Sequence, residues 1–389
     1  MVTQSHYTPF EMIEKLVSYD TTSRTSNLEL IDFVVGYLAV HGVTSSLIHN
    51  DDKSKTNLTA TLGPGQSGGI VLSGHTDVVP VDGQDWSTDP FTPVNKSGRI
   101  YGRGTTDMKS FLAIALALVP EFLKRDLHTP IHLALSYDEE IGCLGAPRLV
   151  EHIVKHVPRP KLVVIGEPTD MKVISAHKGI HAFRTTVTGR EAHSSATHKG
   201  VNAVMVAADL IGFIAKLAQQ CIEASDSSSP FDPPYTTLQV GTITGGTALN
   251  IIAKSCTFDW EIRALPTDSP DDFLAQFNAH VRNEILPKLK TVSEEAHIET
   301  IVLAHVPAFQ SRAQSDIESL MLMIAQQNET GAVSYGTEAG IFEAADIPTF
   351  VCGPGNIAQA HRPNEYIEHA QIDACTTFMH RLMDQVCNA

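Results

Sequence analysis

The spacing of hydrophobic positions predicts that helices and strands alternate through both ends of the chain. Apolar residues recur at helical intervals over 8–18 and 27–41. Shorter apolar runs predict strands at 57–62, 69–75, 130–137, 161–165 and 171–176, and further helical patterns lie at 108–125 and 144–155. Late in the chain the pattern predicts a helix at 315–327, a strand at 348–352 and a closing helix at 370–387. This alternation indicates an α/β fold with a central mixed sheet.

The middle of the chain has a different pattern. The predicted order is strand, helix, strand, strand, helix, strand, at 180–188, 201–219, 236–244, 255–264, 270–288 and 297–304. That order is typical of a ferredoxin-like α+β domain. We therefore expect residues 178–304 to form a domain inserted into a larger one, which consists of residues 1–177 and 305–389.

Composition and charge exclude several classes of protein. The 389 residues are 42% hydrophobic and 19% charged, which fits two globular domains and opposes disorder. A formal net charge of −16 opposes binding to nucleic acid or to an anionic membrane. The N-terminus has no basic start followed by an apolar stretch, and no run approaches eighteen uninterrupted apolar residues. The six cysteines lack CxxC spacing, so we expect a cytoplasmic protein with reduced thiols.

The end of the strand at 69–75 carries the first candidate chemistry. His75 and Asp77 are two positions apart in the run 71–80, where side chains two apart point to the same side of a strand. A histidine that binds a metal usually donates its other ring N–H to an acceptor, and Asp77 is placed to accept it. Taken alone, this pair is more often a surface hydrogen bond than a metal site.

Acidic residues and a second histidine recur after other predicted strands and turns. They are Asp107, Glu139, Glu140, Glu167 and His361. In an open α/β sheet, ligands collect outside the carboxyl ends of the strands, so these side chains are expected to converge on one cleft. Clustered carboxylates demand cations, and a mixed set of nitrogen and oxygen ligands suits zinc, with cobalt or manganese as possible substitutes.

Each of these residues also has an ordinary structural interpretation. Asp107 could cap the helix that begins near Met108, and Glu139 with Glu140 could form an acidic turn. Glu167 could be a loop acid before a proline, and His361 a surface histidine. Their occurrence together in one chain favours the metal site.

Six motifs resemble the M20 family of dinuclear metallopeptidases and deacylases, and within it the acetylornithine deacetylases. They are SGHTDVVP at 73–80, GRGTTDMK at 102–109, SYDEEIGCLGA at 136–146, IGEPT at 165–169, GREAHSS at 189–195 and HRPNEY at 361–366. They extend over most of the chain. One departure is Ser110, where a glycine is usual.

The resemblance implies a role for each residue of the cluster. Asp107 would bridge two zinc ions, with His75 and Glu167 as further ligands of one ion and Glu140 and His361 as those of the other. Glu139 would be the general acid/base and Asp77 the partner of His75. The family pattern also implies a cis peptide between Asp107 and Met108.

The same resemblance assigns residues of the inserted domain. His193 matches a histidine that stabilises the oxyanion, commonly in the active site of the opposite subunit of a homodimer. Asn250 and Arg263 match positions that bind the substrate carboxylate, a task that suits a planar guanidinium. The ordinary alternatives are a surface histidine and an exposed strand arginine. The loop 336–340 receives no role.

These observations predict a zinc-dependent amidohydrolase that acts on a small N-acyl amino acid. The substrate that the resemblance favours is N2-acetyl-L-ornithine, which would give L-ornithine and acetate. A succinyl-diaminopimelate desuccinylase, an aminoacylase or a carboxypeptidase would use the same chemistry. A non-catalytic binding or scaffold protein is the alternative from another class, and it is opposed by the presence of every ligand and of Glu139.

Overall fold

The computed structural model describes residues 6–64, 68–312 and 315–387. The chain forms two compact units, one of residues 1–176, 310–331 and 337–389 and the other of residues 177–309 and 332–336. The inserted domain was predicted at 178–304. In the structure the second unit extends to 177–309 and also includes a short later segment, 332–336.

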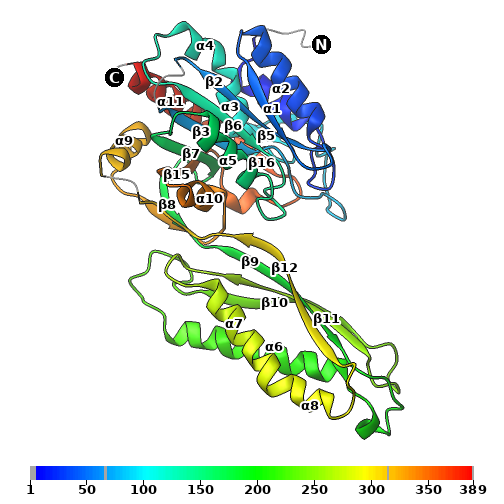
Figure 1. The fold of residues 1–389 in the computed structure, drawn as a ribbon. Helices are drawn as coiled ribbons and strands as arrows, with labels where there is room; N and C mark the ends of the chain where they lie inside the picture. Colours follow the sequence, from blue (N-terminus) through cyan, green and yellow to red (C-terminus); the bar gives the residue numbers. More distant parts are fainter. Residues whose placement is uncertain (1–5, 65–67, 313–314, 388–389) are drawn as a thin grey trace. The chain divides into compact units, whose positions relative to one another are not determined.

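The larger unit is built on a nine-stranded mixed sheet (Figure 1). Its longer strands are β1 (Ser45–His49), β2 (Thr56–Leu62), β3 (Ile70–His75), β6 (Ile131–Ser136), β7 (Leu162–Pro168), β8 (Ile174–His177) and β15 (Thr349–Gly353). Two short strands, β13 (Phe309–Gln310) and β14 (Gly331–Val333), complete it. The order β6-β3-β7-β15 at its centre is parallel throughout, whereas β1, β2 and β8 pair antiparallel with their neighbours. The carboxyl ends of the four central strands therefore lie at one edge.

A small three-stranded sheet and a set of helices surround the large sheet. The small sheet has the order β16-β5-β4 and comprises β4 (Val94–Lys96), β5 (Arg99–Tyr101) and β16 (Tyr366–Glu368). The helices are α1 (Pro9–Val17), α2 (Leu28–Val40), α3 (Lys109–Ala117), α4 (Val119–Lys124), α5 (Ala146–His156), α9 (Ser315–Ala325), α10 (Ala339–Ala344) and α11 (His369–Cys387). The predicted helix at 108–125 is thus two helices, because Pro120 has no backbone N–H to continue the first.

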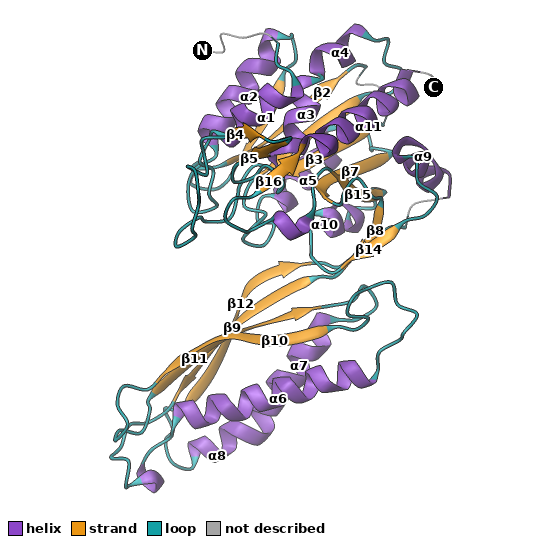
Figure 2. Ribbon diagram, turned by 180° about the vertical axis from the view of Figure 1, so that it is seen from behind, coloured by secondary structure: helices purple, strands orange, loops and turns teal. Residues whose placement is uncertain are grey.

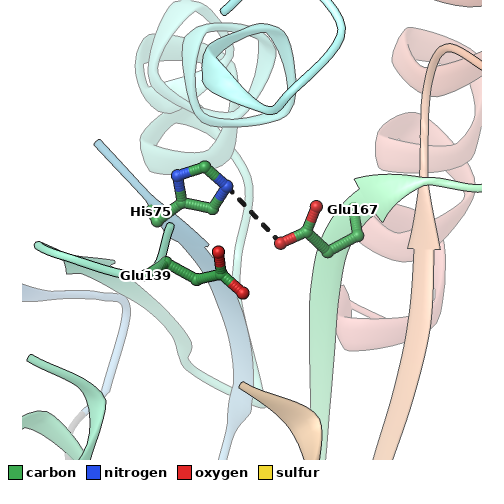
Figure 3. A group of neighbouring side chains, drawn as sticks. All are labelled: His75, Glu139 and Glu167. Atoms are coloured by element: carbon green, nitrogen blue, oxygen red, sulfur yellow. Dashed lines mark ion pairs between the residues drawn. The ribbon is translucent and has the colours of Figure 1, made fainter. Parts of the chain in front are cut away.

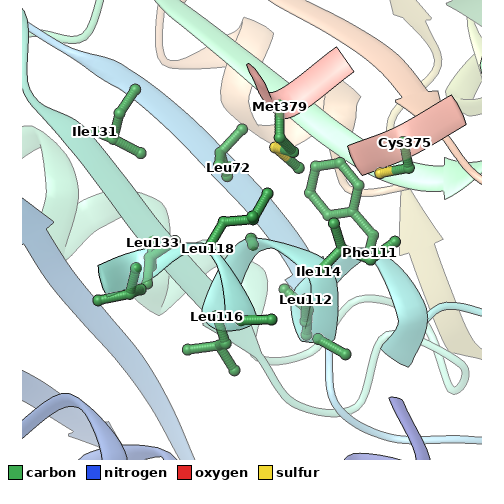
Figure 4. Packing of buried hydrophobic residues seen from close by; sticks show 14 of the residues in the cluster. Leu72, Phe111, Leu112, Ile114, Leu116, Leu118, Ile131, Leu133, Cys375 and Met379 are labelled. Carbon is green, nitrogen blue, oxygen red and sulfur yellow. The ribbon is translucent and has the colours of Figure 1, made fainter. Parts of the chain in front are cut away.

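Helix α3 lies at the centre of the hydrophobic core. Every residue of this helix is buried, which fits a helix that is apolar on nearly all sides. Its side chains pack against β3, β6 and α11, with Phe111 near Cys375 and Met379 (Figure 4). This packing fixes the start of α3, and so the segment that carries Asp107, against the sheet.

The second unit has the predicted order of elements and a four-stranded antiparallel sheet, β10-β11-β9-β12. Its elements are β9 (Ile180–Thr188), α6 (Ala203–Glu223), β10 (Thr237–Gly245), β11 (Ser255–Arg263), α7 (Pro270–His280), α8 (Leu286–Lys290) and β12 (His297–Val306). The helices cover one face of the sheet (Figure 2) around a core that contains Trp260, Phe183 and Phe277. A π-helical turn at Val281–Ile285 separates α7 from α8. The ferredoxin-like insertion expected from the sequence is therefore present.

Helix α6 is long and apolar enough to cross a membrane by the criteria of length and composition alone. One side of it, including Leu210, Ile214 and Leu217, is buried in the core of the second unit. A core helix of this kind meets the same criteria, so its apolar character has a structural explanation.

Replacement of Gly166 tests the packing between β7 and α3. A Cβ at this position would lie 2.0 Å from the Phe111 ring, which is enclosed by the core. We expect Gly166→Ala to lower the free energy of unfolding by roughly 1–3 kcal/mol, because overpacking forces the helix or the strand to move. Urea unfolding measures this change. Gly212→Ala in α6 is the control, since no atom lies within 4 Å of its Cβ position and the change should stabilise the helix. Equal stability of the Gly166→Ala variant and the unmodified protein would contradict this packing.

Candidate metal centre

The carboxyl edge of the parallel strands carries all five predicted ligands. His75 is the last residue of β3, Glu167 lies near the end of β7, and Glu140 follows β6. Asp107 precedes α3, and His361 follows β15 in a left-handed backbone conformation (φ 63°). Residues from five places in the chain therefore meet at the edge where an open α/β sheet binds its ligands.

The two carboxylate oxygens of Asp107 face two different sets of partners. On one side, His75 Nε2 lies 3.0 Å from Asp107 Oδ1 and 3.5 Å from Glu167 Oε1. On the other side, His361 Nε2 lies 3.3 Å from Asp107 Oδ2 and 3.1 Å from Glu140 Oε2. Asp107 thus lies between the two sets.

Two groups of ligand atoms lie close enough together to hold a metal ion. His75 with Asp107 and Glu140 forms one group, and His75 with Glu139 and Glu167 forms the other (Figure 3), with ligand atoms within 4.8 Å of one another in each. Glu139 thus lies among the ligands, although the sequence assigned it to proton transfer. Oxygen and nitrogen donors without thiolates suit a catalytic ion such as zinc, cobalt or manganese better than a closed structural zinc site.

The charges of the cluster fit a cation. Burial and the neighbouring Asp107 carboxylate raise the pKa of Glu140 to about 7 and the pKa of Glu167 well above its usual value. Burial opposes protonation of His75, but the Glu167 carboxylate and the hydrogen bond to Asp107 raise its pKa well above the usual range. One oxygen of Glu140, Oε1, is buried without a hydrogen-bond partner among the described residues. Bound cations would satisfy these oxygens and displace the protons from the histidines.

Asp77 contacts both His75 and the two adjacent glutamates. His75 Nδ1 lies 2.9 Å from the main-chain carbonyl of Asp77 and 3.6 Å from its carboxylate. The carboxylate also accepts hydrogen bonds from the backbone N–H groups of Glu139 (3.1 Å) and Glu140 (3.3 Å) and from the Ser23 hydroxyl (2.7 Å). Asp77 therefore fixes the positions of both glutamates, and its carbonyl orients the imidazole.

Glu139 lies in a polar but poorly solvated position. Burial raises the pKa of its carboxyl group well above the usual value. The Cys143 thiol donates a hydrogen bond to its side chain at 3.5 Å. A carboxyl group in these surroundings holds a proton more readily than a solvated one does, which suits a group that transfers protons.

Glu338 is an acid without a predicted role. It precedes α10, its side chain is buried, and neither carboxyl oxygen makes a hydrogen bond of normal geometry to a described residue. Burial raises its pKa to about 7, and the Ser136 hydroxyl lowers it in part. No sequence signal marks this position as buried, because the loop 336–340 is rich in glycine and polar residues.

The structure also resolves the local alternatives for the Asp107 segment. Met108 is the N-cap residue of α3, no side chain caps the helix, and the peptide between Asp107 and Met108 is cis, as the resemblance implied. Asp107 is therefore not a helix cap. Ser110 is accommodated because its hydroxyl donates a hydrogen bond to the Thr105 carbonyl.

The candidate residues of the second unit lie in two separate regions, one near each end of β11. His193 and Asn250 are both exposed and adjacent, since the Ser194 N–H donates to the Asn250 carbonyl at 3.1 Å. Arg263 lies at the far end of β11 from Asn250 and forms an ion pair with Glu261 at 2.9 Å. Asn250 and Arg263 of one chain therefore lie apart, and their role in binding the substrate carboxylate stays a prediction.

The chain is similar to known proteins over nearly its whole length. Residues 71–385 match the model of peptidase family M20/M25/M40. The chain is 32% identical to an acetylornithine deacetylase of Pasteurella multocida, with 95% of this chain and 94% of that protein covered. It is 34% identical to an acetylornithine deacetylase of Proteus mirabilis, with 97% of each covered.

Solved structures share the fold at lower sequence identity. An M20 family metallo-carboxypeptidase from Sulfolobus solfataricus superimposes with a TM-score of 0.77 at 15% identity, covering 98% of this chain and 100% of that one. A dinuclear metal-binding peptidase of the same family from Bacillus subtilis gives a TM-score of 0.65 at 12% identity, with 97% of each chain covered. The extent of the family match and the identity to its members show that this chain belongs to peptidase family M20/M25/M40, a family of hydrolases.

Proposed function

We propose that the protein hydrolyses the amide bond of N2-acetyl-L-ornithine to give L-ornithine and acetate, with two zinc ions as cofactors. The observation that carries this proposal is the position of Asp107, whose two oxygens face separate sets of ligands with Glu139 beside them. The acetylornithine deacetylases among its relatives support the choice of substrate. This reaction would take place in the cytoplasm as a step of arginine biosynthesis.

The residues of the centre fit the two ions. His75 and Glu167 would hold one ion, Glu140 and His361 the other, and Asp107 both. When bound, a pair of zinc ions polarises the amide carbonyl and lowers the pKa of a coordinated water to about 7.

Glu139 then moves the proton. Its carboxylate would take a proton from the attacking water and pass it to the nitrogen of the leaving amine. The Asp77 carboxylate accepts hydrogen bonds from the backbone N–H groups of Glu139 (3.1 Å) and Glu140 (3.3 Å). It thereby fixes both residues, so the two adjacent glutamates can take different tasks. Because Glu139 is half-buried and desolvation raises its pKa, it retains a proton more readily than a solvated carboxyl group does.

The second unit would complete the site in a homodimer. His193 and Asn250 lie at the opposite end of β11 from Arg263, so a substrate contacted by all three needs residues from two chains. Exposed apolar side chains are present on this unit for such an interface. They include Met205, Ile243, Leu249, Ile251, Ile301, Val302 and Leu303. Apolar side chains on edge strands and on an exposed helix are typical of a surface that another chain covers.

Exchange of subunits tests this arrangement. We expect His193→Ala and Glu139→Ala each to be nearly inactive as pure proteins, and their mixture after subunit exchange to recover about a quarter of the activity. That fraction follows because half of the dimers would be mixed and each mixed dimer has one intact site. Sedimentation velocity reports the dimer. An inactive mixture, or a fully active monomer, would contradict it.

A panel of N-acyl amino acids tests the substrate. We expect kcat/KM for N2-acetyl-L-ornithine to exceed the values for N-succinyl-L-diaminopimelate, N-acetyl-L-methionine and a dipeptide by at least about tenfold, which corresponds to roughly 1.4 kcal/mol. A higher value for the succinylated compound would identify a desuccinylase, and a higher value for the dipeptide would identify a peptidase.

The scaffold alternative requires a separate test. Dialysis against a chelator should abolish hydrolysis, and added zinc or cobalt should restore it. A protein that binds the substrate but shows no hydrolysis after metal is restored would be a binding protein.

A further inference from the structure

A buried acid outside the predicted ligand set holds the Asp107 segment in place. Glu365 is 1% exposed, and its carboxylate accepts hydrogen bonds from the backbone N–H groups of Thr106 (2.8 Å), Gly104 (3.1 Å) and Asp107 (3.2 Å). The Arg103 guanidinium donates to it at 2.7 Å. One carboxylate thus binds several donors from the segment that presents the bridging ligand.

Hydrogen bonds to main-chain carbonyls also join the segment around Asp107 to the segment around Glu365. The Gly102 N–H donates to the Glu365 carbonyl at 2.9 Å, and the Thr106 hydroxyl donates to the Tyr366 carbonyl at 2.6 Å. Tyr366 is also paired with Tyr101 in the antiparallel β16·β5 ladder. The position of Asp107 is therefore defined by residues that follow it by some 260 positions.

The contacts continue from Arg103 to the other side of the centre. Arg103 is buried and donates from Nη2 to the Gln84 side-chain oxygen at 2.6 Å. The Gln84 amide in turn donates to the main-chain carbonyl of His361 at 2.9 Å. An unbroken path of hydrogen bonds thus runs from the Asp107 N–H through Glu365, Arg103 and Gln84 to His361.

The ends of this path are the two residues that meet on one side of the centre, where His361 Nε2 lies 3.3 Å from Asp107 Oδ2. Glu140 is the third residue on that side, and the path does not include it. A buried ion pair such as Arg103–Glu365 is a poor general source of stability, because desolvation offsets the attraction between the charges. Its geometry does, however, fix the segments that it joins.

We propose that Glu365 and Arg103 are positioning residues that set Asp107 against His361 and so determine the affinity of the cation site formed by Asp107, Glu140 and His361. The proposal rests on the two-cation function proposed above. Outer partners of metal ligands of this kind typically change metal affinity by about 10–100-fold when they are replaced.

The test is a zinc titration of metal-free protein. Calorimetry and competition with a chromophoric chelator measure the affinity of each zinc ion. In the unmodified protein we expect two bound zinc ions. Glu365→Gln keeps the shape of the side chain but turns an amide group toward the donors of this segment. We expect this variant to bind one of the two ions about 10–100-fold less tightly and the other ion with a smaller change.

Glu368→Gln is the matched control. Glu368 is the last residue of β16, the strand that begins directly after Glu365. It pairs with Arg99 at 2.9 Å, and 49% of its side chain is exposed, whereas Glu365 is buried. The control should keep both zinc affinities. A folded Glu365→Gln variant that binds two zinc ions as tightly as the unmodified protein would overturn the proposal.

A second variant decides the case in which Glu365→Gln does not fold. Gln84→Ala removes the contact to the His361 carbonyl from a half-buried loop position and leaves the Arg103–Glu365 pair in place. Weaker binding of one zinc ion by this variant supports the proposal, and unchanged binding overturns it. Failure of the unmodified protein to bind two zinc ions would instead contradict the proposed function itself.

Discussion

Glu139→Ala is expected to lower kcat by about 10²–10⁴-fold while the protein still binds two zinc ions. The expected loss is large because Glu139 is the acid of this group that the proposed ligand sets leave free to transfer a proton. Its position is fixed by the hydrogen bond from its own N–H to Asp77, which the substitution retains. Steady-state kinetics with N2-acetyl-L-ornithine and zinc analysis of the same sample measure the two effects together.

Two further variants sharpen this result. Glu139→Gln keeps the volume of the side chain but cannot accept the proton, so its activity should be as low as that of the alanine variant. Glu151→Ala removes an exposed acid of α5 and should leave kcat unchanged. Near-normal turnover in either Glu139 variant would show that another group is the base, and loss of zinc from both would place Glu139 among the ligands.

Asp107→Ala should abolish both zinc binding and turnover. Asp107 Oδ1 lies 3.0 Å from His75 Nε2, and Asp107 Oδ2 lies 3.3 Å from His361 Nε2. The substitution therefore removes a ligand from both sides of the metal centre at once. In the unmodified protein, zinc should raise the melting temperature because it binds the folded state. The variant should show little increase at the same zinc concentration. Thermal unfolding with and without zinc, together with metal analysis, measures this difference.

The control for this substitution is Asp82→Asn, which removes an exposed acid paired with Arg24. It should keep the zinc-dependent rise in melting temperature. If Asp107→Ala bound two zinc ions with unchanged stability, Asp107 would not be a shared ligand and the division of the centre into two sides would be wrong.

Local pattern was sufficient to predict the elements that present most of the site. Buried strands such as β3 and β7 are continuous apolar runs, and the polar residues that follow them mark their carboxyl ends. Because parallel strands end at one edge, the sequence also predicted that His75, Glu140 and Glu167 would converge. The assignment of Asp107 as a bridge depended on the family resemblance, since an aspartate before a helix has an ordinary interpretation as a cap.

Contacts between distant segments could not be predicted in this way. No pattern in the sequence connects Glu365 with Asp107 or Gln84 with His361, because these pairs depend on how loops pack in three dimensions. Spacing likewise indicated only the Asp77 carboxylate as a partner of His75, whereas the main-chain carbonyl of the same residue lies nearer to the imidazole. Short strands such as β4, β5 and β16 were missed because three residues are too few to show a period.

Two cations held by Asp107 and its partners are proposed to make this chain an amide hydrolase. The most direct test is to add zinc in steps to metal-free protein while hydrolysis of N2-acetyl-L-ornithine and bound metal are measured in the same samples. We predict that binding saturates at two zinc ions per chain and that hydrolysis appears with them. Saturation without hydrolysis of any N-acyl amino acid, or a protein that binds no zinc, would contradict this account.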